Sequence, residues 1–386
     1  MSTTEIDKSQ DTAKPYSVRN VLFKTAILFI LANLIFAVFY PLPAIGKFSA
    51  YNHLFPGRQR LPYGDNPQKA YNLSLFNLEA MFASHELSGK EKSQNEFRVI
   101  FIGDSSTWGF LLPDDQTITA KINAADLQLP DGRMVRAYNL GYPVMSLTKD
   151  LVILSYAMRY QPDLIVWPVT LESFPYDKQL YPPLLLNNPD PVKKLIKEYK
   201  LNLDPNSVHW VEPGFWGRTI IGARRSLADI FRLQLYGILW SATGIDQDIP
   251  ETYTARQEDL QNDLSFHNLK PDQIQENDLA FDILGAGIEM AGNTPVLLIN
   301  EPMFISRGKN SDIRYNFYYP RWAYDGYRQL LSVISNQKGW NYKDYWNVIP
   351  ADDFTNSAVH MDSNGTTIFA RQVMEAILEL VNPKPG

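Results

Sequence analysis

The stretch from Thr25 to Gly46 contains no charged residue, and its first part, Ala26 to Tyr40, is almost wholly apolar. Asn33 is the polar interruption in that part. An uncharged helix of this length would extend about 33 Å, which is enough to cross the hydrocarbon core of a bilayer. The sequence therefore predicts a transmembrane anchor at residues 25–46.

This stretch has two other interpretations. A cleaved signal peptide has a shorter apolar core and a small-residue cleavage site, whereas this run is long and follows a polar leader. A buried core helix usually carries a polar stripe, which this run lacks. The uncleaved anchor is the prediction that best fits the pattern.

Basic residues on the two sides of the anchor indicate its orientation. Four precede it and three follow it closely: Lys8, Lys14, Arg19 and Lys24, then Lys47, Arg58 and Arg60. The positive-inside rule favours a cytoplasmic leader at residues 1–24. We therefore expect a single-pass protein of the cell membrane with its large C-terminal body on the extracytoplasmic side.

The composition of the chain excludes several classes of function. Lys and Arg total 36 and Asp and Glu total 42, a formal net charge of −6, which argues against nucleic acid as the partner. There is no cysteine, so disulfides, thiolate catalysis and Cys-ligated metals are excluded. No HExxH, EF-hand or phosphate-loop motif occurs in the sequence, and no metal or cofactor is expected.

Short apolar segments alternate with helical patterns in the C-terminal body. Strands are expected at Arg98–Ile102, Val135–Asn139, Asp163–Val169, Thr294–Asn300 and Trp346–Ile349, and helices at Leu147–Tyr160 and Ser363–Val381 with Ser363 or Asn364 as N-cap. Buried strands alternating with helices predict a three-layer α/β/α domain with a parallel sheet. Ligands of such sheets bind beyond the carboxyl ends of the strands.

Two regions lie outside this alternation. Residues 47–96 are rich in Pro and Gly and are expected to form a connector with one helix around Leu73–Ser84. Residues 174–285 form an insertion that is too long for an ordinary crossover. Its aromatic and arginine-rich part, residues 215–244, is expected to be a helical cap packed on the domain. The alternative is a lid, or a surface that lies on the membrane or on a partner such as a membrane protein.

Ser105 follows the first strand of the body in the sequence Gly-Asp-Ser, where a tight turn would expose its hydroxyl. A serine is a poor nucleophile unless a base takes its proton, and histidine is the usual base. Of the five histidines, only His360 lies in a loop after a late strand and before the last helix. Glu301, after the fourth strand, is expected to pair with Arg321 or Arg328.

These residues resemble the SGNH (GDSL-like) hydrolase superfamily. The resemblance lies in FIGDSSTWG at residues 101–109 and in FTNSAVHMDSNG at residues 354–365. It implies an SGNH-like domain at residues 97–386 of flavodoxin-like architecture that needs no cofactor. The anchor makes the chain similar to the membrane-tethered branch that includes polysaccharide O-acetylation proteins and the D-alanyl-transfer proteins of teichoic acid synthesis.

The resemblance also implies roles for individual residues. Ser105 would be the nucleophile, His360 the general base, and the N–H groups of Ser105 and Gly141 part of the oxyanion hole. The third block of the superfamily, Gly-x-Asn-Asp, is absent, and Thr170 and Glu172 stand at the equivalent strand end as possible oxyanion or substrate contacts.

The acidic residue that should orient the histidine is also missing at its usual spacing. Asn356, which is favoured by motif position, and Asp353 are the two alternatives. The resemblance implies a serine esterase or acyltransferase that acts on acyl esters, especially O-acetyl esters, of a carbohydrate or cell-envelope substrate. The alternative is a catalytically degenerate protein of the same fold that serves as a binding or scaffold protein in a membrane complex.

Overall fold

The computed structural model describes residues 17–63, 77–206, 208–271 and 274–382. The chain divides into two compact units. One consists of Met1–Pro41 with Pro213–Arg225, and the other of Leu42–Glu212 with Ser226–Gly386.

Helix α1 (Val18–Phe39) carries the apolar stretch of the first unit. Almost all of its side chains are exposed, which overturns the interpretation as a core helix, and it is long and apolar enough to cross a membrane. It ends at Phe39 because Tyr40 adopts a left-handed backbone with φ of 38° and a proline follows. The predicted span, residues 25–46, therefore begins and ends seven residues later than the observed helix, residues 18–39.

A five-stranded parallel sheet is the centre of the second unit, with strand order β2-β1-β3-β4-β5. The strands are β1 (Glu96–Gly103), β2 (Met134–Gly141), β3 (Leu164–Val169), β4 (Val296–Asn300) and β5 (Asn341–Asp344). The order places β1 and β3 side by side at the point where the chain reverses direction across the sheet, which is where ligands bind in such folds. The first four strands were predicted, but the fifth strand precedes the expected Trp346–Ile349.

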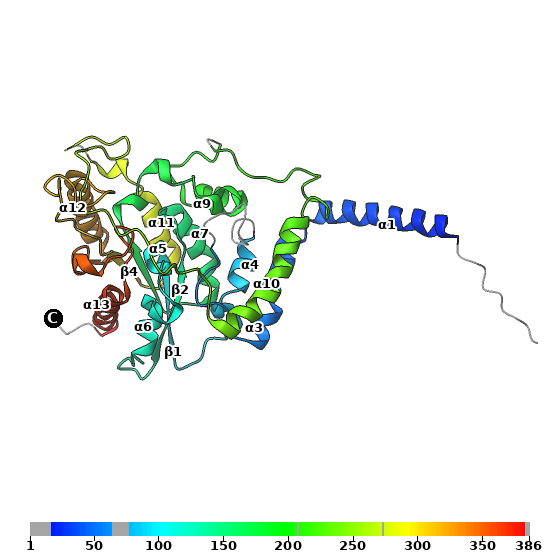
Figure 1. Cartoon of the computed structure of the whole chain (residues 1–386), viewed down its shortest axis with the longest axis horizontal. Helices are drawn as coiled ribbons and strands as arrows, with labels where there is room; N and C mark the ends of the chain where they lie inside the picture. The colour runs from blue at the N-terminus through cyan, green and yellow to red at the C-terminus, as the bar shows by residue number, and fades with distance from the viewer. Residues whose placement is uncertain (1–16, 64–76, 207, 272–273, 383–386) are drawn as a thin grey trace, which may run out of the picture. The chain divides into compact units, whose positions relative to one another are not determined.

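The remaining α-helices lie on the two faces of the sheet, in the connector and in the insertion (Figure 1). They are α2 (Leu42–Gly46), α3 (Ala50–Leu54), α4 (Leu78–Ala83), α5 (Ser105–Trp108), α6 (Ile118–Ala124), α7 (Leu147–Ala157), α8 (Pro183–Leu186), α9 (Pro189–Tyr199), α10 (Arg224–Thr243), α11 (Phe281–Ala291), α12 (Arg321–Lys338) and α13 (Ser363–Val381).

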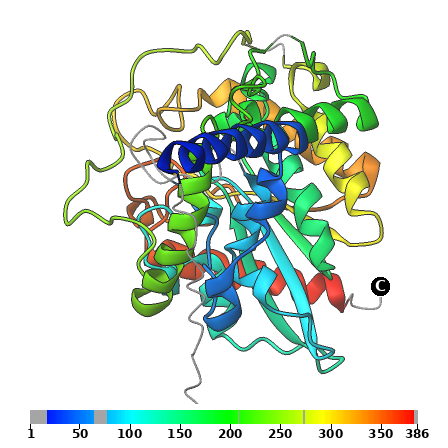
Figure 2. The same ribbon diagram turned by 90° about the vertical axis from the view of Figure 1, so that its right-hand side faces the viewer.

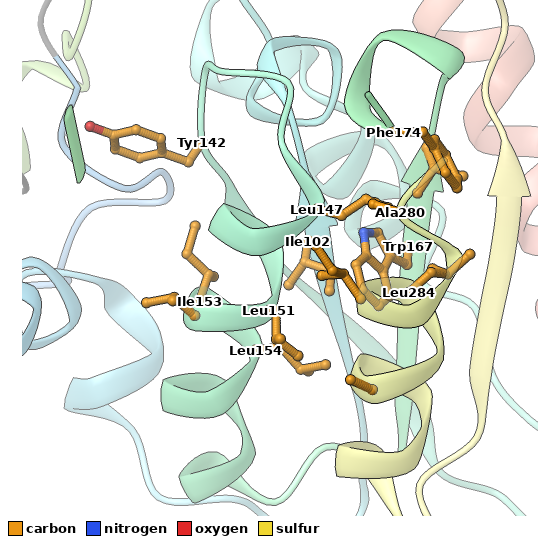
Figure 3. Packing of buried hydrophobic residues seen from close by; sticks show 14 of the residues in the cluster. Ile102, Tyr142, Leu147, Leu151, Ile153, Leu154, Trp167, Phe174, Ala280 and Leu284 are labelled. Atoms are coloured by element: carbon orange, nitrogen blue, oxygen red, sulfur yellow. The ribbon is translucent and has the colours of Figure 1, made fainter. Parts of the chain in front are cut away.

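Two hydrophobic cores lie on the two faces of the sheet. On one face α7, α11 and α12 pack on strand residues such as Trp167, and Figure 3 shows this indole between Leu151 of α7 and Leu284 of α11. On the other face α6 and α13 pack on residues such as Phe101 and Val166. The three-layer α/β/α architecture predicted from the sequence is therefore confirmed.

The insertion and the connector differ in detail from the prediction. The insertion contains α8, α9 and α10, and the connector contains α2, α3 and α4. The helix expected around Leu73–Ser84 is observed only as Leu78–Ala83, since residues 64–76 lie outside the described part. The N-cap of α13 is Asp362, whose carboxylate accepts two backbone N–H groups, and neither Ser363 nor Asn364 has that role.

Helix α10 packs on the connector and acts as a cap, one of the two interpretations of this part of the insertion (Figures 1 and 2). The Oε1 atom of Gln234 accepts the N–H of Ala50 at 2.7 Å, and the ring of Tyr51 lies against Gly237. Only glycine fits there, because a Cβ would lie 2.3 Å from the tyrosine ring.

Candidate active site

Ser105 begins α5 directly after β1, at the carboxyl edge of the sheet. The turn requires glycine at position 103, because φ is 153° and a Cβ would lie 2.4 Å from Thr107 Oγ1. Asp104 caps α5 by accepting the N–H of Ser106 at 2.8 Å. The turn thus leaves the Ser105 side chain half-buried at the end of the strand.

His360 lies in the loop between a 3₁₀ turn at Ala351–Asp353 and α13. The loop is held in a hairpin, since the N–H of Thr355 donates to the carbonyl of His360 at 2.8 Å. The imidazole Nε2 lies 2.7 Å from Ser105 Oγ. Two segments far apart in the sequence therefore bring a hydroxyl and an imidazole within hydrogen-bonding distance.

Asn356 occupies the other side of the imidazole, with its Oδ1 atom 2.8 Å from His360 Nδ1. An amide oxygen only accepts hydrogen bonds, so the ring carries its proton on Nδ1. Nε2 is then the unprotonated nitrogen and accepts the hydroxyl of Ser105. The geometry is that of a nucleophile, a base and an orienting group, with an amide in the place of the usual carboxylate.

Phe110 stacks on the His360 ring, with ring centroids 4.8 Å apart and an angle of 28° between the planes. Burial lowers the pKa of His360 to about 4, because the protonated ring would lose its water. The imidazole is therefore neutral across the ordinary pH range, as a general base must be. Phe110 was not identified from the sequence, since its position relative to the histidine depends on the tertiary fold.

Asp353, the other residue proposed to orient the histidine, lies elsewhere. Its Oδ2 atom accepts the side-chain amide of Asn364 at 2.9 Å. Its backbone carbonyl accepts the N–H of Asp362 at 2.8 Å. Asp353 therefore fixes the start of α13, and Asn356 is the partner of His360.

Gly141 lies at the end of β2, but its N–H does not face an open site. It donates to Asn139 Oδ1 at 3.0 Å, and a Cβ at this position would lie 2.5 Å from the backbone nitrogen of Trp108. The expectation that this N–H contributes to an oxyanion hole is corrected: Gly141 is required for the close packing of β2 against α5. The N–H of Ser105 remains available to donate to an oxyanion, because the N–H groups of the first residues of a helix have no acceptor within the helix.

Thr170 and Glu172, at the end of β3, also have partners within the protein. The hydroxyl of Thr170 is buried and lies 2.8 Å from the hydroxyl of Tyr319. Glu172 accepts from Lys178 Nζ at 2.6 Å and lies 3.3 Å from His267 Nε2. The structure gives neither side chain a contact with Ser105 or His360.

Glu172 is part of a charged cluster with Asp177, Lys178 and His267. Burial alone would raise the pKa of Glu172, but hydrogen bonds from His267 and Lys178 outweigh it and hold that pKa below its ordinary value. The hydrogen bond with Glu172 raises the pKa of His267 in turn. The cluster joins the insertion to the end of β3, and no sequence signal linked these residues.

A second buried cluster lies behind the Ser105 turn. Glu301, fully buried after β4, lies close enough to the Asp104 carboxylate for that charge to act on its pKa. Among the described residues no donor reaches either Glu301 oxygen, so an ionised Glu301 would be an uncompensated buried charge. Burial and the neighbouring Asp104 charge raise the pKa of Glu301 well above its ordinary value, and a protonated Glu301 can donate to Asp104.

Lys149 completes this cluster from α7. Its buried ammonium group donates to the carbonyl of Gly103 at 2.6 Å and to Asp150 Oδ1 at 2.5 Å. Asp150 also accepts the indole N–H of Trp167 at 3.2 Å. The expected pairing of Glu301 with Arg321 or Arg328 does not occur: Arg328 binds Asp344 and Arg321 donates to the carbonyl of Ser311.

No group of His, Asp and Glu side chains suited to a metal ion occurs within the described ranges. At the carboxyl edge of the sheet, the reactive groups that the structure brings together are the Ser105 hydroxyl and the His360 imidazole.

Neither a known family model nor a curated protein matches this sequence. Solved structures give similarities of low identity. A lipase/acylhydrolase from Enterococcus faecalis is 14% identical with a TM-score of 0.35, over 75% of this chain and 99% of that chain. A G-D-S-L family lipolytic protein from Veillonella parvula DSM 2008 is 11% identical with a TM-score of 0.35, over 72% and 96%. A catalytic mutant of the acetylxylan esterase Axe2 from Geobacillus stearothermophilus is 12% identical with a TM-score of 0.28, over 74% and 94%.

Proposed function

We propose that this chain is a membrane-anchored serine esterase or acyltransferase that acts on acyl esters of a carbohydrate or cell-envelope substrate. The observation that carries the proposal is the continuous contact from Ser105 Oγ through His360 to Asn356 Oδ1, with distances of 2.7 and 2.8 Å. This arrangement lets an imidazole remove the proton of a serine hydroxyl while its ring orientation is fixed.

The first half of the reaction forms an acyl-enzyme. Ser105 Oγ attacks the ester carbonyl carbon as His360 Nε2 takes the hydroxyl proton, and the carbonyl oxygen becomes an oxyanion. The N–H of Ser105 donates to that oxyanion. The intermediate then collapses, the bond to the leaving alcohol breaks, and His360 returns its proton to the alcohol oxygen.

The second half releases the acyl group. Water, or a sugar hydroxyl in the transferase version, attacks the acyl-Ser105 carbonyl as His360 takes its proton. The bond to Ser105 Oγ breaks and the serine recovers its hydrogen from His360. Hydrolysis and transfer share the first half and differ only in the attacking hydroxyl.

Asn356 has one consequence for this mechanism. An amide orients the imidazole and fixes the proton on Nδ1, but it adds no negative charge to stabilise the imidazolium that forms. The proposed enzyme therefore depends on burial to keep His360 neutral at rest and on the oxyanion donor in the transition state.

The location of the reaction follows from α1. We propose that α1 spans the cell membrane, with the leader on the cytoplasmic side and the Ser105 site on the extracytoplasmic side. A tethered domain at that surface would reach acyl groups, such as O-acetyl groups, on carbohydrates of the cell envelope.

Hydrolysis of p-nitrophenyl acetate by the full chain in detergent tests the esterase chemistry. Ser105→Ala and His360→Gln are expected to lower kcat at least about 10³-fold, as loss of a triad member does. His209→Gln, a histidine exposed in the insertion, is the matched control and should retain full activity. Equal, retained activity of Ser105→Ala and the wild-type chain would refute the mechanism. No activity of the folded wild-type chain would favour a degenerate binding protein.

A further inference from the structure

The turn at residues 109–112 carries Phe110, whose ring stacks on the imidazole of His360. Two residues of this turn have a left-handed backbone: Gly109 with φ of 89° and Leu111 with φ of 64°. Glycine adopts this conformation freely, but a leucine in it is strained and persists there only where neighbouring groups hold it. The turn that places Phe110 on the histidine therefore depends on contacts from outside the turn.

Gln247, from the part of the insertion that follows α10, binds this turn with both atoms of its side-chain amide. Its Oε1 atom accepts the N–H of Leu111 at 3.1 Å. Its Nε2 atom donates to the carbonyl of Leu112 at 2.7 Å and to the carbonyl of Gly109 at 3.2 Å. One side chain thus fixes the strained leucine and the carbonyl groups at both ends of the turn.

Arg60, from the connector, donates to the same two carbonyl groups. Its Nη1 atom lies 2.8 Å from the Gly109 oxygen and 3.0 Å from the Leu112 oxygen. The side chain is 1% exposed, and its guanidinium lies 4.6 Å from the ring centre of Trp108, the last residue of α5. The turn is therefore held by two side chains from segments that are far from it in the sequence.

Asp246 joins these two side chains. Its carboxylate accepts the Nε–H of Arg60 at 2.9 Å and also binds Nη2 of the same guanidinium. Asp114 lies 2.6 Å from that Nη2 atom, so the buried positive charge is compensated. A bidentate pair fixes geometry as well as charge, and Asp246 directly precedes Gln247 in the chain. We call the side chains of Arg60, Asp246 and Gln247 the turn clamp.

We infer that Arg60 and Gln247 are positioning residues, which support the proposed reaction by keeping the Phe110 ring on the imidazole of His360. Phe110 directly precedes the strained Leu111, so a turn that relaxes at the leucine also displaces the phenylalanine. The inference rests on the proposed function, because the ring that Phe110 covers is the proposed general base. It makes the segment after α10 a part of the active site, in addition to the role of α10 as a cap.

Two variants weaken the clamp without removing a charge. Gln247→Leu removes three hydrogen bonds from the turn, and the fold should survive it because Gln247 is only partly buried. Arg60→Lys keeps the positive charge beside Asp246, but one ammonium group cannot reproduce the fork of the guanidinium. Gln257→Leu is the matched control, since this exposed glutamine of the insertion donates only to the carbonyl of Asp259.

The first measurement is the pH profile of kcat/KM for p-nitrophenyl acetate. Gln247→Leu and Arg60→Lys should move the acid limb upward by at least about one pH unit, as exposure of the imidazole to water does. The double variant Phe110→Ala/Gln247→Leu should have the acid limb of Phe110→Ala alone, because changes that act through one contact are not additive. Gln257→Leu should keep the wild-type profile.

Two kinetic results would overturn the inference. One is a lower kcat of Gln247→Leu with an acid limb that does not move, which indicates a purely structural effect. The other is a double variant whose acid limb moves beyond that of Phe110→Ala, since the clamp would then act by a route other than Phe110.

The second measurement does not depend on activity. Diethyl pyrocarbonate modifies accessible, unprotonated imidazole nitrogens, and no acyl-enzyme can form in a Ser105→Ala background. The rate of His360 modification at pH 7, relative to the exposed His209 of the same chain, should rise at least about fivefold when Gln247→Leu is added. It should not change when Gln257→Leu is added instead.

An unchanged rate of His360 modification in the Gln247→Leu chain would overturn the inference, whatever the activity of the wild-type chain. A fivefold rise together with an inactive wild-type chain would refute the proposed function and support the clamp on the Phe110 ring.

Discussion

Asn356 Oδ1 lies 2.8 Å from His360 Nδ1, so an amide and not a carboxylate orients the imidazole of the Ser105 site. Asp353, the other residue considered for this role, accepts the side-chain amide of Asn364 instead. This relationship determines both the tautomer of His360 and the absence of a negative charge beside it, and each has a measurable consequence.

Replacement of Asn356 by Asp should increase activity and change its pH dependence. A carboxylate stabilises the imidazolium that forms in the transition state, and we expect kcat at pH 8 to rise at least about tenfold. The same charge raises the pKa of His360, so the acid limb of kcat/KM should move to higher pH. A lower kcat with an unchanged acid limb would contradict the role given to Asn356.

The Asn356→Ala variant is the complementary control. It removes the acceptor for the Nδ1 proton and should lower kcat by about 10²- to 10³-fold, since the ring loses its orientation. Its thermal stability should stay close to that of the wild-type chain, because Asn356 lies partly exposed in a loop.

Phe110 shields one face of the His360 ring. Because burial is what lowers the pKa of His360 to about 4, the wild-type profile of kcat/KM should be flat down to about pH 5 and fall below it. Phe110→Ala admits water and should move this acid limb upward, toward the ordinary histidine value near 6.5. An acid limb that stays in place would show that another group lowers the histidine pKa.

The Asp104–Glu301 pair makes stability depend on pH. Glu301 keeps its proton in the folded chain but loses it near pH 4.5 when unfolded, so the folded state binds the extra proton above that pH. Stability therefore falls as pH rises from 4.5 toward the raised pKa of the folded state, by at most about 1.4 kcal/mol per pH unit. In Glu301→Gln the amide has nearly the same shape as the protonated carboxyl group and can donate a hydrogen bond to Asp104, but it does not titrate.

We expect the Tm of Glu301→Gln to exceed that of the wild-type chain at pH 8 and the difference to shrink at pH 5. Glu289→Gln, on the exposed face of α11, is the matched control and should leave the pH dependence of Tm unchanged. A Tm difference for Glu301→Gln that is the same at both pH values would contradict the assignment of the proton.

Gly141 offers a test between packing and oxyanion binding. Because a Cβ would lie 2.5 Å from Trp108 N, Gly141→Ala should destabilise the fold by about 1–3 kcal/mol and displace α5. Tm and kcat should fall together. A lower kcat at unchanged Tm would instead place this residue in the oxyanion hole.

The sequence was sufficient for the parts of the fold that depend on local pattern. The apolar runs Val99–Ile102 and Leu164–Val169 predict buried strands of a parallel sheet. In the structure both runs are buried and lie in neighbouring parallel strands. Strand β5 was placed too late because its residues are polar and partly exposed, so hydrophobicity does not distinguish it from a loop.

The site was only partly predictable for a physical reason. Ser105 and His360 were selected because each follows a strand or precedes a helix at the carboxyl edge, and the structure places them 2.7 Å apart. Phe110 and the Asp104–Glu301 pair were missed, because their contacts depend on how loops fold back in three dimensions. The expected use of Gly141 failed since the side chain of Asn139 already binds its N–H.

The most direct test of the central claim is the intact mass of the full chain after reaction with a fluorophosphonate. The account predicts one covalent adduct, located at Ser105 by peptide mapping, that is lost in Ser105→Ala and strongly slowed in His360→Gln. Equal labelling of Ser105→Ala and the wild-type chain, or no labelling of folded wild-type chain, would contradict it.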